Sequence, residues 1–366
     1  TPASGKTFVY VSAAADGEIA IFDMDLETGG LTAVGKVRAG KRVMPLAQSP
    51  DRRFLYASIR SSPYSVATYA ADRKTGDLTL LSTVPLPDNM AYISTDKTGR
   101  FLLSASYAGD KVTVNPIGDR GLVQADAVQV MATGRNAHAI LTDPSNRFAY
   151  VTNLGSDQIM QLIFDEDTGL LTPNKPAVVH TPAGSGPRHF CFAPNSKFVY
   201  LVDELNGMVH VYAFDSRTGQ LREVQKISAV PRGADLVPGK PRAAIGKESS
   251  KALAAPDTSA WIWCADIHIT PDGKFLYVSE RTTSTLAAFS VDTVTGKLTY
   301  INSFDTETQP REFNIGPRGN FLVCAGQKSG HISVHKINRE TGELSRIKRY
   351  EAGRDPAWVE IVAIFD

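Results

Sequence analysis

Short runs in which apolar and polar residues alternate recur along the whole chain, and turns rich in Gly, Asp and Asn separate them. The segments 17–22 (GEIAIF) and 208–214 (MVHVYAF) are two examples. A period of two residues is typical of a β-strand that buries one face. The pattern therefore predicts an all-β protein.

Seven strands are preceded by similar turns, which reveals an internal repeat. The seven copies read KTFVY, PDRRFLY, KTGRFLL, PSNRFAY, PNSKFVY, PDGKFLY and PRGNFLV. They end 46 to 50 residues apart, except that 77 residues separate the fifth copy from the sixth. A later tight turn in each repeat carries a glycine, as in ETGGL or RTGQL, and glycine supplies the positive φ that such a hairpin requires. A repeat of this length is typical of the blades of a β-propeller.

The fold that we predict is a seven-bladed β-propeller with four antiparallel strands per blade. Each complete repeat has a strand before its turn, such as 189–192 (HFCF), but the first repeat lacks it. The C-terminal segment 355–362 (DPAWVEIV) resembles the missing strand and has no repeat after it. We expect it to join the N-terminal blade and close the ring, which removes exposed sheet edges. Residues 1–366 then form a single domain.

The 77-residue interval predicts a long loop insertion at about residues 229–262. Its central part, 231–260, is rich in Pro, Gly, Ala, Lys and Ser and has no strand periodicity. Such a loop is either a lid over a site or a solvated insertion, and the sequence leaves both open.

Composition and charge exclude several classes of function. The formal net charge of +1 gives no general attraction to nucleic acid or to anionic membranes. No apolar run approaches the roughly 18–20 residues that span a bilayer, and the three cysteines lack the C-x-x-C spacing of a zinc site. We expect no metal, no cofactor, no nucleic-acid or membrane partner, and a monomer or small homo-oligomer. The expected compartment is the cytoplasm, or the periplasm if the first residue, which is not Met, follows a removed export signal.

The candidate functional side chains are predicted to lie at one face of the ring. Because antiparallel neighbours alternate direction, the start of each innermost strand and the end of its neighbour lie at the same mouth of the central channel. The ionisable and amide residues that this alignment brings together there are Arg188, Arg281, Arg311, Lys328, Gln327, His138, His189, His268, Glu204 and Asp266. Such a cluster in a nearly neutral protein attracts anions.

Side chains of these types fit the hydrolysis of an anionic lactone. Arginine binds carboxylate or phosphate through two hydrogen bonds, and His or Glu can take a proton from water. We expect Arg188, Arg281 and Arg311 to bind the anionic group and polarise the carbonyl. Either His138 or Glu204 activates the water, and the sequence does not choose between them. The substrate is further bound by Lys328, Gln327, His189, Asp266 and His268, although Arg–Glu and His–Asp pairs also serve as structural ties between blades.

Six segments carry a resemblance to a known family. They are GPRHFCFAPN (186–195), VDELN (202–206), CADIHITPDG (264–273), ERT (280–282), TETQPREFNIG (306–316) and AGQKSGHISV (325–334). With them the chain resembles, over nearly its whole length, the propeller-type 6-phosphogluconolactonases of bacteria, a family that also includes fungal 3-carboxy-cis,cis-muconate lactonising enzymes. The resemblance implies a metal-independent lactonase or cycloisomerase site at His138, Arg188, Glu204 and Arg281. It favours hydrolysis of 6-phospho-D-glucono-1,5-lactone to 6-phosphogluconate in the oxidative pentose phosphate pathway.

Three alternative functions stay open. The first is a cycloisomerase that closes an unsaturated carboxylate into a lactone. The second is a lactonase for an unphosphorylated aldonolactone, which an exported protein would favour. The third is a non-catalytic binding module, because the same fold hosts many functions.

Overall fold

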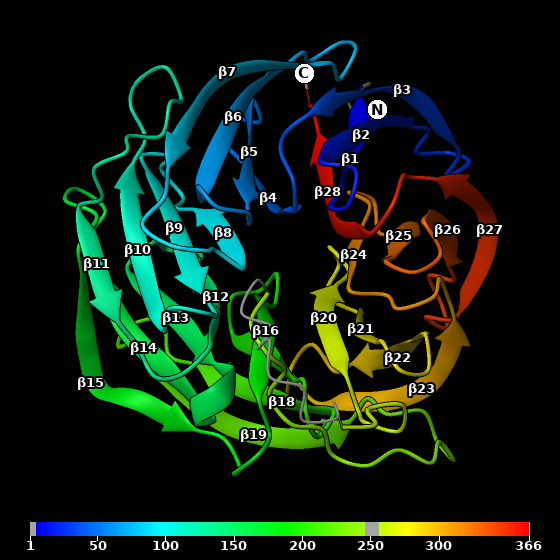
Figure 1. Cartoon of the computed structure of the whole chain (residues 1–366). Coiled ribbons are helices and arrows are strands. Elements are labelled where there is room, and N and C mark those ends of the chain that lie inside the picture. The colour runs from blue at the N-terminus through cyan, green and yellow to red at the C-terminus, as the bar shows by residue number, and fades with distance from the viewer. Residues whose placement is uncertain (1–4, 246–255, 366) are drawn as a thin grey trace.

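The computed structural model describes residues 5–245 and 256–365. Their strands form seven four-stranded antiparallel sheets arranged around a central channel, which confirms the predicted seven-bladed propeller (Figure 1). From the channel outward, blades 1 to 3 consist of β28 (Pro356–Ala363), β1 (Thr7–Ala13), β2 (Glu18–Met24) and β3 (Leu31–Arg38); β4 (Val43–Gln48), β5 (Phe54–Ile59), β6 (Ser65–Ala71) and β7 (Leu78–Pro85); and β8 (Tyr92–Thr95), β9 (Phe101–Ser106), β10 (Lys111–Pro116) and β11 (Gln129–Ala132).

The other four blades follow in chain order. They consist of β12 (Ala137–Thr142), β13 (Phe148–Asn153), β14 (Gln158–Phe164) and β15 (Leu171–His180); β16 (Pro187–Phe192), β17 (Phe198–Asp203), β18 (Met208–Phe214) and β19 (Leu221–Ser228); β20 (Cys264–Ile269), β21 (Phe275–Glu280), β22 (Thr285–Val291) and β23 (Leu298–Asp305); and β24 (Glu312–Ile315), β25 (Phe321–Gly326), β26 (His331–Ile337) and β27 (Leu344–Glu351). One 3-10 turn, η1 (Leu154–Ser156), follows β13.

The C-terminal strand closes the ring as predicted. Strand β28 pairs antiparallel with β1 and places Glu360 opposite Tyr10. The first and the last strand of the chain therefore lie side by side in blade 1 (Figure 1).

The repeated aromatic and glycine positions join neighbouring blades. The Tyr150 hydroxyl of β13 donates a hydrogen bond to the carbonyl of Gly219, in the turn before β19 of the next blade, at 2.5 Å. The φ of Gly219 is +73°, and a Cβ at this position would lie 2.3 Å from the ring of Phe148. The same tyrosine–glycine bond recurs at Tyr10–Gly76, Tyr56–Gly121, Tyr200–Gly296 and Tyr277–Gly342. The turn glycine is thus required for both its backbone conformation and its small size.

The core lies between the blades, because the second strand of each blade is buried on both faces while the outermost strand is largely exposed to solvent. Strands β13 and β17 are buried at every residue, whereas β27 buries only its first residue fully. Apolar side chains of adjacent blades pack together, as Tyr200 and Val211 do with Leu276 and Phe289. No helix in the described part of the chain is long and apolar enough to cross a membrane.

The long loop lies between β19 and β20, where the sequence predicted an insertion, and its described residues reach back over the channel mouth. The amide of Gly239 donates to the carbonyl of Leu205 at 2.9 Å. The carbonyl of Arg242 accepts a hydrogen bond from the Tyr107 hydroxyl at 2.8 Å, and that of Ile245 accepts one from the Asn89 carboxamide at 3.2 Å. Residues 246–255 of the predicted insertion lie outside the described residues, and whether the loop acts as a lid stays open.

Candidate active site

A cavity of about 140 Å³ opens at the mouth of the channel, and five arginines are among the residues that line it. We call it the mouth cavity. Its lining includes Arg60, Tyr107, His138, Arg188, Glu204, Arg242, Trp263, Arg281 and Arg311. Five arginines and one glutamate therefore face the same small space, and their excess positive charge suits an anionic ligand.

Glu204 is the negative centre of the mouth cavity. It follows β17 directly, and its Oε1 accepts hydrogen bonds from Arg188 Nε at 3.2 Å and from Arg281 Nη2 at 2.5 Å. All three residues are buried, with exposed fractions of 5%, 0% and 4%. Arg188 and Glu204 come from the start of β16 and the end of β17 in one blade, and Arg281 follows β21 of the next blade, so antiparallel pairing and the ring bring the three to the same mouth. The predicted neighbours Arg188, Glu204 and Arg281 are thus brought together.

Three buried nitrogen atoms of the mouth cavity have no hydrogen-bond partner within the described ranges 5–245 and 256–365. They are Nη2 of Arg188, Nε of Arg311 and Nδ1 of His138. An unpaired buried polar group costs about 1–3 kcal/mol, and a charged one costs more. Groups of this kind are expected where a ligand supplies the missing partners.

Arg60, Arg281 and Arg311 stay charged at neutral pH while His138 is neutral. Burial lowers the pKa of Arg281 to about 9, against the attraction of Glu204, and burial with the charge of Arg311 lowers that of Arg60 to about 9. Burial and the charge of Arg188 lower the pKa of Arg311 to about 10. Burial and the charge of Arg188 also hold the pKa of His138 well below its usual value, so its ring has a lone pair for accepting a proton.

Two aromatic–cation contacts connect the insertion to this cavity. The indole of Trp263 lies 4.0 Å from the guanidinium carbon of Arg281 and 3.7 Å from that of Arg242, measured to the ring centroid. Sequence reasoning missed Arg242 and Trp263. Arg242 lies in a segment without strand periodicity, so no register could place it, and Trp263 gave no signal beyond its position just before β20.

A second, larger cavity of about 370 Å³ lies further along the innermost strands, and we call it the channel cavity. Its polar lining includes Gln48, Lys97, His189, Asp266, His268, Glu312 and Glu360. Packed rings lie between the two cavities. The His189 ring makes edge contacts with His138 at 5.1 Å and Tyr92 at 5.2 Å between centroids, and a tilted contact with Trp358 at 6.1 Å. The sequence predicted one cluster, but the structure divides it, with His189, Asp266 and His268 in the channel cavity.

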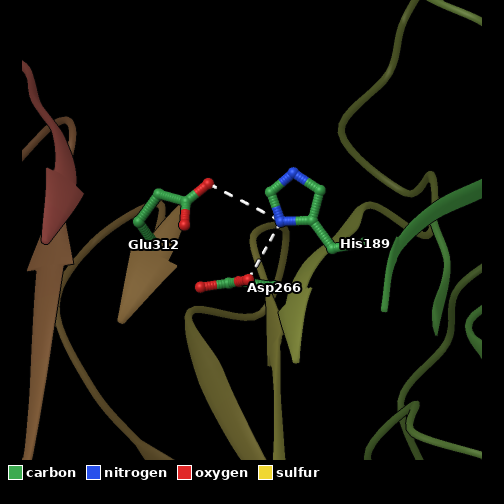
Figure 2. Close-up of side chains that lie close together, drawn as sticks. All are labelled: His189, Asp266 and Glu312. Carbon is green, nitrogen blue, oxygen red and sulfur yellow. Dashed lines mark hydrogen bonds and ion pairs between the residues drawn. The ribbon is translucent and has the colours of Figure 1, made fainter. Parts of the chain in front are cut away.

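Asp266 is the centre of the channel cavity and binds both of its histidines. Its Oδ1 lies 2.9 Å from His189 Nδ1, and its Oδ2 lies 2.9 Å from His268 Nε2. Burial alone would raise the pKa of Asp266, but the charge of His268 and the hydrogen bond from His189 hold it well below its usual range. Figure 2 shows Glu312 beside His189 and Asp266. The distance from Glu312 Oε1 to His189 Nδ1 is 3.8 Å. Glu312 was not predicted from the sequence.

His189, Asp266 and Glu312 are close enough to hold a metal ion, because one ligand atom from each lies within 4.8 Å of the others. Glu312 Oε1 is buried and has no hydrogen-bond partner within the described residues. His189 Nδ1, however, already bonds Asp266, while its Nε2 faces Arg188 Nη1 at 3.3 Å. A metal on Nδ1 would move the ring proton to Nε2, against an N–H of Arg188. The contacts of His189 therefore fit a hydrogen-bonded imidazole better than a metal ligand.

Two predicted substrate-binding residues lie outside both cavities. Lys328 is exposed in the turn between β25 and β26. The carboxamide of Gln327 accepts a hydrogen bond from Gln309 at 3.0 Å and donates one to Asp355 at 2.9 Å. Both residues lie in the turn that follows β25, as predicted, but neither lines the mouth cavity or the channel cavity.

Comparison with known proteins agrees with the seven-bladed fold. The model of the family described as "Lactonase, 7-bladed beta-propeller" matches residues 8–361. The chain belongs to this lactonase family. A 6-phosphogluconolactonase of Pectobacterium carotovorum is 38% identical over 357 residues, which cover 97% of this chain and 98% of the relative. One of Serratia proteamaculans is 37% identical and covers 98% and 99%.

A solved structure of a periplasmic gluconolactonase from Pseudomonas aeruginosa is also similar to this lactonase-family chain. It superposes with a TM-score of 0.84 at 26% identity and covers 98% of this chain and 99% of the other. Proteins similar to this chain are thus named for a phosphorylated and for an unphosphorylated sugar lactone.

Proposed function

We propose that this protein is a lactonase that hydrolyses 6-phospho-D-glucono-1,5-lactone to 6-phosphogluconate. The observation that carries the proposal is the set of unpartnered donors in the mouth cavity, on Arg188 and Arg311, beside the buried pair of Glu204 and Arg281. An anionic substrate with a carbonyl to polarise supplies the acceptors that these donors lack. The names of the curated relatives support the same substrate.

In this mechanism the water oxygen attacks the lactone carbonyl carbon and the negative charge moves to the carbonyl oxygen. Guanidinium N–H groups of Arg188 and Arg311 stabilise that oxyanion. When the carbon–ring-oxygen bond breaks, the ring oxygen takes a proton and becomes the hydroxyl of the open chain. The new carboxylic acid ionises at neutral pH, so each turnover releases one proton.

Two groups can take the proton from the attacking water. His138 is neutral, buried and has a free Nδ1, which suits a general base. Glu204 accepts from both arginines at Oε1, which leaves Oε2 as the oxygen for a water. The commitment of Glu204 to two ion pairs favours His138 as the base and Glu204 as the residue that holds Arg188 and Arg281 in place.

The charge of the mouth cavity favours a phosphorylated lactone. Five arginines face one glutamate, and guanidinium binds phosphate through two charge-assisted hydrogen bonds. An unphosphorylated aldonolactone is the second candidate, because a periplasmic gluconolactonase has the same fold at 26% identity. We further propose the cytoplasm as the compartment, since phosphorylated sugars are made there, and the site residues His138, Arg188, Glu204, Arg281 and Arg311 as the substrate-contacting set.

The test is the rate of hydrolysis of freshly generated 6-phosphogluconolactone, beside gluconolactone and a carboxymuconate. The wild type should exceed spontaneous hydrolysis with the phosphorylated lactone, and His138→Ala and Arg188→Ala should each remove most of that gain. Lys328→Ala is the matched control, because it removes a cation outside both cavities and should change kcat/KM less than about 2-fold. Turnover of gluconolactone alone would transfer the assignment to the unphosphorylated substrate, and no turnover of any lactone would refute the proposal.

A further inference from the structure

A chain of hydrogen bonds leads from the channel cavity to an arginine of the mouth cavity. Asp266 on β20 binds Nδ1 of His189 at 2.9 Å, and Nε2 of His189 faces Arg188 Nη1 at 3.3 Å. Arg188 Nη1 also donates to the carbonyl of Ala265 at 2.6 Å, and its Nε donates to Glu204. Only Nη2 of this guanidinium is left without a partner among the described residues.

The protonation of His189 follows from its surroundings. Burial and the charge of Arg188 lower its pKa to about 3, although the hydrogen bond to Asp266 acts in the opposite direction. The ring is therefore neutral at working pH and carries one N–H. Asp266 can only accept, because its own pKa lies well below the usual range, so the proton belongs on Nδ1. Nε2 then carries a lone pair, which accepts an N–H of Arg188.

Other charged groups near His189 do not disturb this assignment. Burial and the charge of Asp266 raise the pKa of Glu312 well above its usual value, so Glu312 is neutral beside Asp266. His268 binds the opposite oxygen of Asp266 and keeps that carboxylate charged. Arg311 lies on the mouth side, where its charge disfavours a protonated His189.

We propose that Asp266 and His189 are positioning residues that fix the rotation of the Arg188 guanidinium, so that its free Nη2 is presented to the substrate. Asp266 acts through the tautomer of His189 and does not itself touch the substrate. This inference rests on the proposed function of the mouth cavity. The sequence predicted that both residues bind the substrate. Here they instead position Arg188, which binds it.

Asp266→Asn is the discriminating variant. The amide can donate to Nδ1, which moves the ring proton of His189 to Nε2 and places two N–H groups 3.3 Å apart, against each other. A displaced guanidinium should lower kcat/KM for the phosphorylated lactone by about 10- to 100-fold. The same substitution in an Arg188→Ala background should cost less than about 2-fold, because the group that Asp266 positions is gone. Glu307→Gln is the control, since Glu307 is a buried carboxylate bound to Arg349 and lines neither cavity.

Nitrogen-15 spectra of histidine-labelled protein report the tautomer directly and do not depend on turnover. We expect a proton on Nδ1 of His189 in the wild type and on Nε2 in Asp266→Asn. A proton on Nε2 of His189 in the wild type would overturn the proposed positioning role, even if Asp266→Asn fails to fold. Losses that multiply in the double variant would also overturn it, since they mark a structural tie between blades. If the wild type turns over no lactone, the proposed function fails. The tautomer of His189 still shows whether Asp266 and His189 orient Arg188 as proposed.

Discussion

Replacing Glu204 with glutamine tests the charge balance of the mouth cavity. The substitution keeps the shape of the side chain but removes the negative charge between Arg188 and Arg281, which are 0% and 4% exposed. Breaking a buried ion pair by neutralising one partner costs about 3–5 kcal/mol, because the other charge stays buried and unpaired. For a chain of 366 residues, an unfolding entropy of about 2.1 cal/mol/K per residue converts this loss to about 4–7 °C in Tm.

The assay is thermal unfolding of wild type and Glu204→Gln, without anions and with inorganic phosphate. Phosphate should stabilise the variant more than the wild type, because the anion replaces the missing charge. Glu307→Gln is the control: Glu307 is buried, but its partners Arg346 and Arg349 are 48% and 45% exposed and can hydrate, so its loss should be smaller. Equal Tm losses in the two variants, or no loss in Glu204→Gln, would refute the argument from buried charge.

Three further predictions follow from single residues. If His138 is the base, its lowered pKa keeps it deprotonated as pH falls, so kcat/KM should stay level through about pH 6.5 and decline only below it; a decline centred at 6.5 would contradict this role. Burial opposes charge on His210, but two carboxylates at 2.6 Å raise its pKa, so its stabilisation is full below about pH 6.5 and is lost as pH rises through the raised value. The destabilisation by His210→Gln in urea should therefore shrink from pH 6 toward pH 9, and a constant difference would count against it. Gly219→Ala should lower the free energy of unfolding by more than about 1 kcal/mol, because Gly219 has a positive φ and lies against the Phe148 ring. Denaturant titration measures this loss, and an unchanged midpoint would show that this position tolerates a Cβ.

The repeat made the fold predictable, because each copy carries its own strand and turn residues. Tyr150 and Gly219 occupy the same places in their repeats as Tyr10 and Gly76 do, and both pairs form the same bond. The missing strand of the first repeat could likewise be found at 355–362 by its resemblance to the others. A closed ring allows only one place for such a strand, so the sequence was sufficient.

The site was predictable only as far as strand ends determine it. Arg188, Glu204 and Arg281 meet because each stands at a strand end on the same face. The depth of a side chain in the channel depends on its alternation along an innermost strand, so His189 points to the channel cavity while its neighbour Arg188 reaches the mouth. The bulged pairing between β16 and β17 at this point shifts the register and could not be read from the sequence. Arg242 could not be predicted as a site residue, because the insertion has no counterpart in the other repeats with which to align it.

Above all, we propose that the unpartnered donors of the mouth cavity bind the anionic substrate. A crystal structure with 6-phosphogluconate, the expected product, tests this most directly. We predict phosphate or carboxylate oxygens within hydrogen-bond distance of Arg188 Nη2 and Arg311 Nε, with the open chain beside His138 and Glu204. A product bound in the channel cavity or on the outer surface, with these donors still unpaired, would contradict the account.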